Sequence, residues 1–374
     1  MRIAVLRERR PGERRVALLP EQIPQLLEAG VDVSVESDAG AEVGASDEAY
    51  RAAGAEVGED VLEDVNAVLS VQPINLSTAR RLSEGTVTIS FLPTAEEGPL
   101  VRRLRERQIT SFSMDLVPRT SRAQPMDAMS SQSMVAGYRG AIVAAERLPR
   151  FFPMFMTSAG TVRPAKVLVL GAGVAGLQAI ATARRLGAVV QAYDVRRSSA
   201  EEIASLGAKF VEVDLPPLEG EGGYAREMTE ERSTRQRELL APHVADADVL
   251  ITTASVPGRQ APLLVTAEMV AGMRPGSVVV DLAADQGGNV AGSIPGQELS
   301  VDGVLVWGGS NVASQLPRPA SELYAHNVVN LFLLMVRAGD LHLDFDDDIL
   351  AAACVTHAGR ITHRPTLELL GEVG

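Results

Sequence analysis

The chain has 374 residues, enough for two or three domains of ordinary size. Its 48 acidic residues outnumber 35 Lys and Arg, and the resulting net charge of −13 argues against nucleic acid or an anionic membrane surface as a partner. The single cysteine, Cys354, excludes an internal disulfide and a thiolate metal cluster, and no histidines are spaced as metal ligands, so no metal site is expected.

Short β-rich runs alternate with helical stretches through the first 130 residues. Strands are expected at 3–6, 31–36, 67–71, 86–90 and 108–113. Helices are expected at 20–29, where Gly30 ends the helix, and at 98–107. Strands that alternate with helices predict a parallel sheet covered on both faces, and therefore one α/β domain.

A continuous helix at 130–148 leads into a second series of strands and helices. Its six strands are expected at 167–170, 189–194, 209–213, 249–252, 277–281 and 304–307. Six strands with helices in this order predict a complete Rossmann domain.

A last helical run at 321–336 precedes an acidic tail that we expect to be irregular, and this segment is predicted to cross back to the first domain. The fold class is therefore α/β with two doubly wound parallel-sheet domains. We expect a flavodoxin-like domain from 1–130 plus 321–374, and a Rossmann domain from 131–320. The longest late apolar run, 328–336, is too short to span a bilayer, which predicts a soluble, cytoplasmic chain.

The motif Gly171-Ala-Gly173-Val-Ala-Gly176 follows an apolar strand and opens a helix. Gly171 permits a tight turn, Gly173 lets the backbone approach a pyrophosphate, and Gly176 allows close packing of the helix. The free N–H groups of the helix N-terminus favour phosphate groups. The pattern predicts a dinucleotide site; the alternative is a glycine-rich turn that binds no ligand.

Asp194 stands at the end of the next strand, about twenty residues beyond the motif, where a carboxylate accepts hydrogen bonds from a ribose 2′-OH. A carboxylate there repels a 2′-phosphate, so NAD is favoured over NADP. The adjacent Arg196 and Arg197 leave NADP open.

The stretch 119–130 is dense in guanidinium, amide, carboxylate and hydroxyl groups. Five side chains of this stretch can converge on one polar ligand: Arg119, Arg122, Gln124, Asp127 and Ser130. The alternative is structural, with Ser130 capping the following helix and the arginines in solvent. Spacing alone does not decide between these two interpretations.

The segment 215–228 is rich in Pro and Gly, which disfavours both helix and strand. One interpretation is a lid in which Tyr224 and Met228 exclude water from a bound cofactor. The other is a disordered loop tip.

Neither Lys nor His occurs in the first 165 residues. A dehydrogenase of alcohols or amines moves a proton together with the hydride and normally uses a positioned His, Lys or Tyr. Hydride transfer between two nicotinamides requires no general acid or base, and polar groups that hold the ring suffice. The composition therefore favours transfer to a second nicotinamide.

At these residues the sequence resembles the NAD(H)-binding component, domain I or alpha-1 subunit, of proton-translocating NAD(P) transhydrogenase. The similarity covers nearly the whole chain, and its most specific stretch is Arg119-Thr-Ser-Arg-Ala-Gln-Pro-Met-Asp127. Alanine dehydrogenases share the fold but differ where substrate chemistry occurs. Gln72 stands where they carry a catalytic Lys, Ser90-Phe-Leu-Pro-Thr94 where they carry His-Leu-Ala, and Ser310 where an Asp precedes Asn.

The resemblance implies roles for individual residues. Asp127 and Ser130 orient the nicotinamide carboxamide, Gln124 reaches toward the partner's nucleotide, and Arg119 belongs to the same loop. The cofactor-binding positions that it implies, with those of the glycine motif, are Arg122, Gly171, Gly173, Val174, Gly176, Asp194, Val195, Arg196, Gly223, Tyr224, Gln236 and Ser255.

The resemblance also implies a transhydrogenase that transfers hydride from NADH to NADP⁺ bound on a partner, coupled to proton translocation by membrane subunits. The implied partners are a second copy of the chain, an NADP(H)-binding beta subunit and a membrane-spanning subunit. The chain would lie at the cytoplasmic face of the plasma membrane, without inserting into it. The alternatives are a stand-alone amino-acid dehydrogenase and a non-catalytic NAD-binding scaffold.

Overall fold

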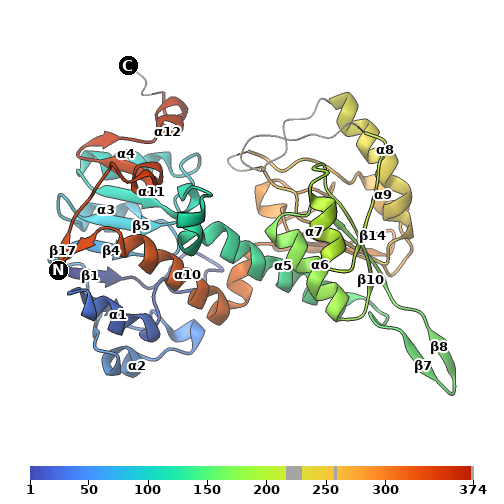
Figure 1. Cartoon of the computed structure of the whole chain (residues 1–374), viewed down its shortest axis with the longest axis horizontal. Helices are drawn as coiled ribbons and strands as arrows, with labels where there is room; N and C mark the ends of the chain where they lie inside the picture. The colour runs from blue at the N-terminus through green and yellow to red at the C-terminus, as the bar shows by residue number, and fades with distance from the viewer. Residues whose placement is uncertain (216–229, 257–258, 372–374) are drawn as a thin grey trace. The chain divides into compact units, whose positions relative to one another are not determined.

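The computed structural model describes residues 1–215, 230–256 and 259–371 (Figure 1). The chain folds into two compact units. Unit 1 combines Met1–Gln132 with Ser314–Gly374, and unit 2 is Ser133–Ala313. Both ends of the chain therefore belong to unit 1.

Unit 1 contains an eight-stranded sheet in the order β19-β18-β6-β5-β4-β1-β2-β3. Its strands are β1 Arg2–Val5, β2 Asp32–Glu36, β3 Glu56–Gly58, β4 Ala67–Leu69, β5 Val87–Ser90, β6 Thr110–Ser113, β18 Cys354–His357 and β19 Arg360–Ile361. The first six are mutually parallel, whereas β18 runs antiparallel to both β6 and β19.

The helices of unit 1 cover both faces of this sheet (Figure 1). They are α1 Ile23–Glu28, α2 Asp47–Ala52, α3 Leu76–Arg81, α4 Gly98–Glu106, α10 Pro317–Leu333, α11 Asp348–Ala353 and α12 Arg364–Leu369. Short 3₁₀ turns η1 Pro20–Gln22, η2 Ala41–Val43, η3 Met114–Leu116 and η4 Ser121–Met126 lie between them, and β16 Val336–Arg337 pairs with β17 Asp340–Leu341.

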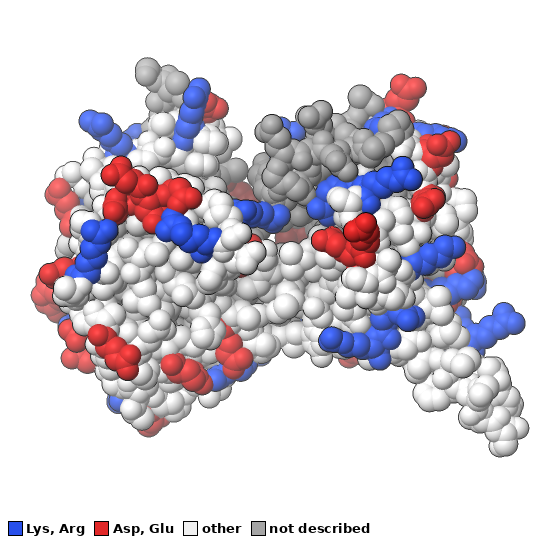
Figure 2. All heavy atoms as spheres, in the orientation of Figure 1, with Lys and Arg blue, Asp and Glu red and all other residues white. Residues whose placement is uncertain are grey.

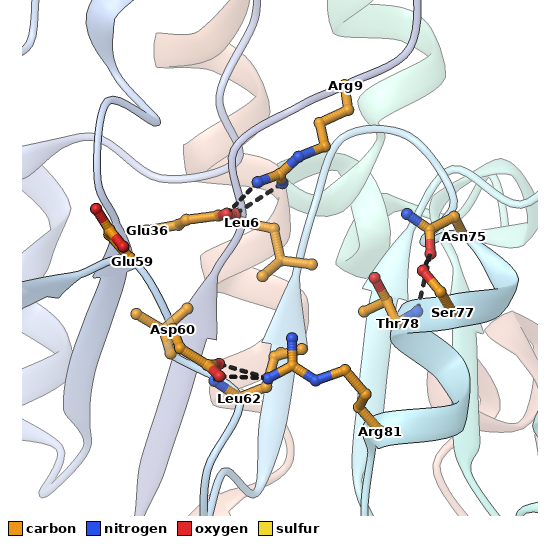
Figure 3. A pocket seen from close by; sticks show the side chains of 11 residues that line it. Leu6, Arg9, Glu36, Glu59, Asp60, Leu62, Asn75, Ser77, Thr78 and Arg81 are labelled. Atoms are coloured by element: carbon orange, nitrogen blue, oxygen red, sulfur yellow. Dashed lines mark hydrogen bonds and ion pairs between the residues drawn. The ribbon is translucent and has the colours of Figure 1, made fainter.

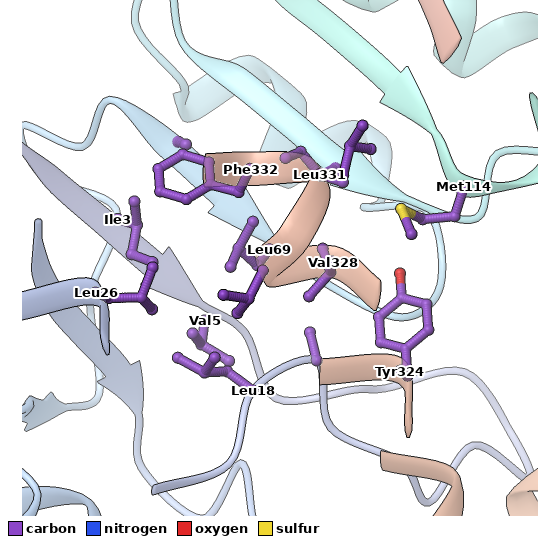
Figure 4. Close-up of a cluster of buried hydrophobic side chains, with 14 of the residues drawn as sticks. Ile3, Val5, Leu18, Leu26, Leu69, Met114, Tyr324, Val328, Leu331 and Phe332 are labelled. Atoms are coloured by element: carbon purple, nitrogen blue, oxygen red, sulfur yellow. The ribbon is translucent and has the colours of Figure 1, made fainter. Parts of the chain in front are cut away.

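Helix α10 lies in the core of unit 1, although it comes from the far end of the sequence. Tyr324, Val328 and Phe332 recur every four residues, so they share one face of the helix. They pack into the cluster that contains Val5 of β1 and Leu69 of β4, and all five side chains are fully buried (Figure 4). The apolar period of the helix therefore fixes the C-terminal segment to the first sheet.

The acidic tail is not irregular, which corrects the prediction from sequence. The carboxylate of Asp347 accepts hydrogen bonds from the N–H groups of Ile349 and Leu350 and thus caps α11. Strands β18 and β19 follow and extend the sheet. The charged run at 344–348 therefore begins a helix.

Unit 2 contains a seven-stranded sheet in the order β11-β10-β9-β12-β13-β15-β14. Its strands are β9 Lys166–Leu170, β10 Val189–Tyr193, β11 Lys209–Phe210, β12 Val249–Thr252, β13 Val278–Asp281, β14 Glu298–Val301 and β15 Val304–Gly308. All are parallel except the edge strand β14, which the sequence analysis missed. The α/β class with two doubly wound sheets is confirmed.

Helix α5, Ala128–Arg147, begins in unit 1 and continues into unit 2. The other helical segments of unit 2 are α6 Val174–Arg185, α7 Ser199–Ser205, α8 Glu230–Asp246, α9 Ala267–Ala271, η6 Ala284–Gln286 and η7 Val312–Gln315, the last of which crosses the boundary. A separate hairpin of β7 Phe155–Thr157 and β8 Gly160–Val162 projects from the unit (Figure 1). Among the described residues, no helix combines the length and the apolar character needed to cross a bilayer.

Candidate functional site

The strand order of unit 2 places its ligand-binding edge at β9. Strand β10 pairs with β9 on one side and β12 pairs with it on the other, so the connections leave β9 in opposite directions. In doubly wound sheets this switch point forms a crevice outside the carboxyl ends of the strands. The glycine motif, Asp194 and Ser255 all follow strands that end at this edge.

Each of the three motif glycines meets a different steric demand. Gly171 adopts φ +99°, a backbone conformation that other residues rarely take. A Cβ on Gly176 would lie 1.9 Å from the Gly171 carbonyl oxygen, so α6 packs directly on the turn. A Cβ on Gly173 would meet no atom within 4 Å, which leaves this part of the backbone open to a ligand. Helix α6 begins at the next residue, Val174, which is itself exposed.

Asp194 lies beside this turn and is 9% exposed. Its Oδ2 accepts a hydrogen bond from the N–H of Ala172 at 2.8 Å, and its Oδ1 accepts one from the N–H of Arg196 at 2.8 Å. The Arg196 guanidinium also donates to both oxygens, at 2.9 and 3.1 Å. These bonds hold the carboxylate at the glycine turn and direct Arg196 toward it.

The loop after β12 is fixed by two buried residues that the sequence analysis missed. Asn289 donates to the Ala254 carbonyl oxygen and accepts from the Ala254 N–H. Asp281, at the end of β13, accepts from the N–H of Asn289, and burial raises the pKa of this carboxyl. The exposed Ser255 therefore stands on a rigid support. Asp281 could have been found from the sequence, because it is an acidic residue at the end of an apolar strand, as Asp194 nearly is.

Gln236 lies inside unit 2. It is 1% exposed on α8, and its Nε2 donates to the Tyr193 hydroxyl at 3.3 Å. Val195 is half-buried directly after Asp194. Gly223 and Tyr224 lie outside the described residues, as does most of the segment that was interpreted as a lid or a loop tip.

In unit 1 the segment 119–130 forms η4 and the start of α5. Ala123 and Met126 are buried in the unit 1 core and fix η4 to it. The side chains of Arg119 and Gln124 are exposed beside them. The same turn therefore anchors the loop with apolar side chains and presents polar ones to solvent.

Asp127 and Ser130 contact each other at the N-terminus of α5. The Asp127 carboxylate accepts from the Ser130 N–H at 2.8 Å and from the Ser130 hydroxyl at 2.6 Å. The helix begins at Ala128, so Asp127 is the capping residue, and the interpretation in which Ser130 caps the helix was wrong.

Arg122 points to the C-terminal segment of unit 1. Its guanidinium makes two hydrogen bonds to the Asp347 carboxylate, at 2.7 and 2.8 Å, and a further ion pair with Asp348. The hydrogen bonds from Arg122 lower the pKa of Asp347 to about 2. Arg122 thus ties the loop to the start of α11.

A buried polar cluster lies where β1 and β4 end. The Arg15 guanidinium pairs with the Glu13 carboxylate, and Gln72 donates to Glu13 at 2.7 Å. Burial alone would raise the pKa of Glu13, but the hydrogen bonds and charge of Arg15 lower it to about 2. Burial raises the pKa of Glu8 to about 7, against hydrogen bonds from Val71 and Gln72 that lower it.

A surface cavity of about 190 Å³ also opens in unit 1, near the end of β2 (Figure 3). Arg9 pairs with Glu36, and Arg81 makes two hydrogen bonds to Asp60. The cavity thus has paired charges, and none of the expected site residues is among the described residues that line it.

The chain is similar to known proteins along nearly its whole length. Models of the alanine dehydrogenase/PNT N-terminal and C-terminal domains match residues 4–136 and 140–364. An NAD(P) transhydrogenase alpha subunit of Rhodospirillum rubrum is 44% identical over 97% of this chain and 98% of its own length. The solved transhydrogenase from Sinorhizobium meliloti has a TM-score of 0.86 at 40% identity, covering 98% of this chain and all of that one. A solved L-alanine dehydrogenase has a TM-score of 0.82 at 28% identity, with both chains fully covered.

Fold and family models together define an α/β protein of the alanine dehydrogenase/PNT class. Identity is higher to the two transhydrogenases than to the alanine dehydrogenase, at 40–44% against 28%. The chain belongs to the family of NAD(P) transhydrogenase alpha subunits, and the family resemblance inferred from its sequence motifs is confirmed.

Proposed function

We propose that this chain is the NAD(H)-binding component of an NAD(P) transhydrogenase. It passes hydride from NADH to NADP⁺ held on a partner beta subunit, and membrane subunits couple this transfer to proton translocation. The observation that carries the proposal is the glycine turn of unit 2 with Asp194 beside it, in a chain 44% identical to a transhydrogenase alpha subunit along nearly its whole length.

The residues of unit 2 fit NAD(H). The open backbone at Gly173 and the N-terminus of α6 suit a pyrophosphate, because free N–H groups favour phosphate oxygens. Asp194 suits a ribose hydroxyl and disfavours a 2′-phosphate. The remaining proposed contacts are Gly171, Val174, Gly176, Val195, Arg196, Gln236, Ser255 and, outside the described residues, Gly223 and Tyr224.

NADH supplies the hydride when bound. Polar residues of unit 1 orient the reacting groups in this proposal. Asp127 and Ser130 hold the carboxamide, Gln124 reaches toward the partner's nucleotide, and Arg119 with Arg122 completes the polar loop. Orientation is the main contribution required, because neither ring gains or loses a proton in the transfer.

The position of Gln72 supports this chemistry over that of an amino-acid dehydrogenase. Its amide donates to Glu13 and does not exchange a proton as a lysine would. The first 165 residues contain no histidine, but unit 1 as a whole does. The C-terminal segment brings in four: His326, His342, His357 and His363. Of these, His357 and His363 form hydrogen bonds with threonine hydroxyls.

A homodimer is included in the proposal, and the β7–β8 hairpin supports it. Every residue of both strands is exposed, and Met156 is 75% exposed. Figure 2 shows the tip of the hairpin without charged side chains. An isolated two-stranded hairpin is marginal in water, so a second copy is expected to cover it. The dimer would lie at the cytoplasmic face of the membrane, bound to the beta and membrane-spanning subunits.

Two measurements test the function. Calorimetric titration should show a clear preference for NADH over NADPH, and equal affinities would overturn the cofactor assignment. Reconstitution with an NADP(H)-binding subunit should then give hydride transfer from NADH to an NADP⁺ analogue. A non-catalytic scaffold would give none, and steady NADH production from 2-amino acids by the chain alone would favour a dehydrogenase.

The dimer has its own test. Replacing residues 154–163 by a short Gly-Ser linker should convert the protein to a monomer in sedimentation velocity experiments. Retention of the wild-type sedimentation coefficient by the variant would show that the hairpin does not hold two copies together.

A further inference from the structure

The loop that carries Gln124 and Asp127 is held from behind by one side chain of α10. Asn327 is 7% exposed, and its Nδ2 donates to the Pro125 carbonyl oxygen at 2.8 Å. Its Oδ1 accepts from the Ser131 hydroxyl at 2.7 Å. One amide therefore joins the chain on both sides of Asp127.

Both ends of this amide are used, and they have opposite hydrogen-bonding character. Asn327 gives an N–H to a carbonyl on one side and offers an oxygen to a hydroxyl on the other. An aspartate keeps the bond from Ser131 but places a second acceptor against the Pro125 carbonyl. The Pro125 carbonyl then loses its donor and faces a negative charge instead, so the loop is expected to move away from α10.

Asn327 is itself held in place by a second tie between α10 and α5. Gln132 donates to the Ala320 carbonyl oxygen at 3.0 Å and accepts from the Arg15 guanidinium at 2.9 Å. The Arg15 guanidinium is fixed in turn by the Glu13 carboxylate. The amide therefore acts from a rigid support that includes the buried cluster of unit 1.

We propose that Asn327 is a positioning residue for hydride transfer. By fixing the backbone from Pro125 to Ser131, it keeps the side chains of Gln124 and Asp127 in one arrangement. This role rests on the proposed function, because only hydride transfer demands such alignment, and small misplacements of reacting groups slow such steps strongly. The nicotinamide cofactor itself need not touch Asn327.

The test compares Asn327→Asp with Asn330→Asp in the complete complex. Asn330 is a matched control, since it lies one turn further along α10 and, among the described residues, its side-chain amide donates to the His326 carbonyl oxygen and not to the loop. Asn327→Asp should slow single-turnover hydride transfer from NADH to NADP⁺ by about tenfold while the NADH dissociation constant changes less than about twofold. Asn330→Asp should leave both unchanged.

Backbone hydrogen exchange supplies a readout besides the rate. The backbone amides of residues 119–127 should exchange faster in Asn327→Asp than in wild type. In the control variant Asn330→Asp, the same amides should exchange at the wild-type rate. If Asn327→Asp fails to fold, Asn327→Ser takes its place, because its shorter side chain loses the Pro125 bond without adding a charge.

The outcomes distinguish failure of the proposed function from failure of the role of Asn327. A wild-type complex without hydride transfer overturns the proposed function and this role together. A wild-type complex that transfers hydride, with an Asn327 variant of equal rate and equal exchange, overturns the role alone. Loss of NADH affinity in step with the rate would assign Asn327 to binding and also overturn it.

Discussion

Both units contain six parallel strands in the same order, third-second-first-fourth-fifth-sixth, yet they differ at the turn after the first strand. In unit 2, β9 ends at Leu170, and only the three residues of the glycine turn separate it from the start of α6 at Val174. In unit 1, β1 is followed by a long irregular stretch, and the next helical turn begins only at Pro20. The stretch 6–19, all of which the structure describes, therefore lacks the helix N-terminus that would face a phosphate at this place.

The acid at the end of the second strand is common to both units. Glu36 accepts from the Arg7 N–H at 2.8 Å, just as Asp194 accepts from the Ala172 N–H at 2.8 Å. Arginine side chains, Arg9 and Arg196, pair with these carboxylates. The hydrogen bond from the first turn to the strand-end acid is thus a structural feature of both sheets. The glycines of unit 2 are what suit its turn to a dinucleotide.

The largest effect is expected at Gly176, where the comparison is steric. Gly176→Ala places a methyl group 1.9 Å from the Gly171 carbonyl oxygen, so α6 must move. The free energy of unfolding in urea should fall by about 3 kcal/mol. Gly58→Ala, whose Cβ would have no neighbour closer than 4.0 Å, is the control and should change it by less than about 0.5 kcal/mol. Equal values for the two variants would contradict this account of the turn.

A second effect concerns the buried carboxyl that follows β1. The pKa of Glu8 is raised from 4.5 to about 7, so the folded state holds a proton that the unfolded state releases. Its contribution to stability is present below pH 4.5 and is lost as the pH rises through 7. Glu8→Gln should therefore become more stable relative to wild type, by about 2 kcal/mol, between pH 5 and pH 8. Urea titrations at both pH values measure this difference, and a constant offset would refute it.

The third prediction separates the two strand-end acids by function. Asp194→Asn should weaken NADH binding about tenfold and reduce the preference for NADH over NADPH, because the ribose loses a charged acceptor. Glu36→Gln removes the charge from the corresponding strand-end acid of unit 1 and should leave both affinities unchanged. Calorimetry on the two variants decides, and equal losses of affinity would mean that Asp194 acts only through the fold.

The smallest effect is expected at Gly173. An added methyl group meets no atom within 4 Å, and the backbone φ of −76° suits any residue, so stability should change by less than about 0.5 kcal/mol. NADH should nevertheless bind about fivefold more weakly, because in the proposed site the methyl group would lie where a phosphate approaches the backbone. Unchanged affinity would show that the cofactor does not approach Gly173.

Much of the fold could be predicted because its strands are local apolar runs. The runs at 67–71 and 249–252 correspond to β4 and β12, and α5 begins two residues before its expected start. Strand β14 was missed, although it alternates in burial and is followed by Asp302-Gly303, a strong hairpin signal. Strand β18 was also missed; it pairs with β19 directly after it and with β6 about 240 residues earlier, and the second pairing could not be read from the local sequence.

In the candidate site, too, the features set by local sequence could be predicted, and those formed by distant residues could not. The glycine motif is visible in the sequence because each glycine answers a local backbone demand. The ion pairs of Arg122 with Asp347 and Asp348 are not, because partners more than 200 residues apart are brought together only by the fold. The support from Asn327 was hidden for the same reason.

The return of the C-terminal segment to unit 1 has a consequence for biosynthesis. Unit 2 is one uninterrupted stretch, so all of its strands have left the ribosome when residue 313 emerges. Unit 1 still lacks α10, β18 and β19 at that moment, and the apolar side of its first sheet stays uncovered until the last segment is made. Unit 1 is therefore begun first but completed last, and premature termination near residue 313 would release a product with an exposed core that is prone to aggregate.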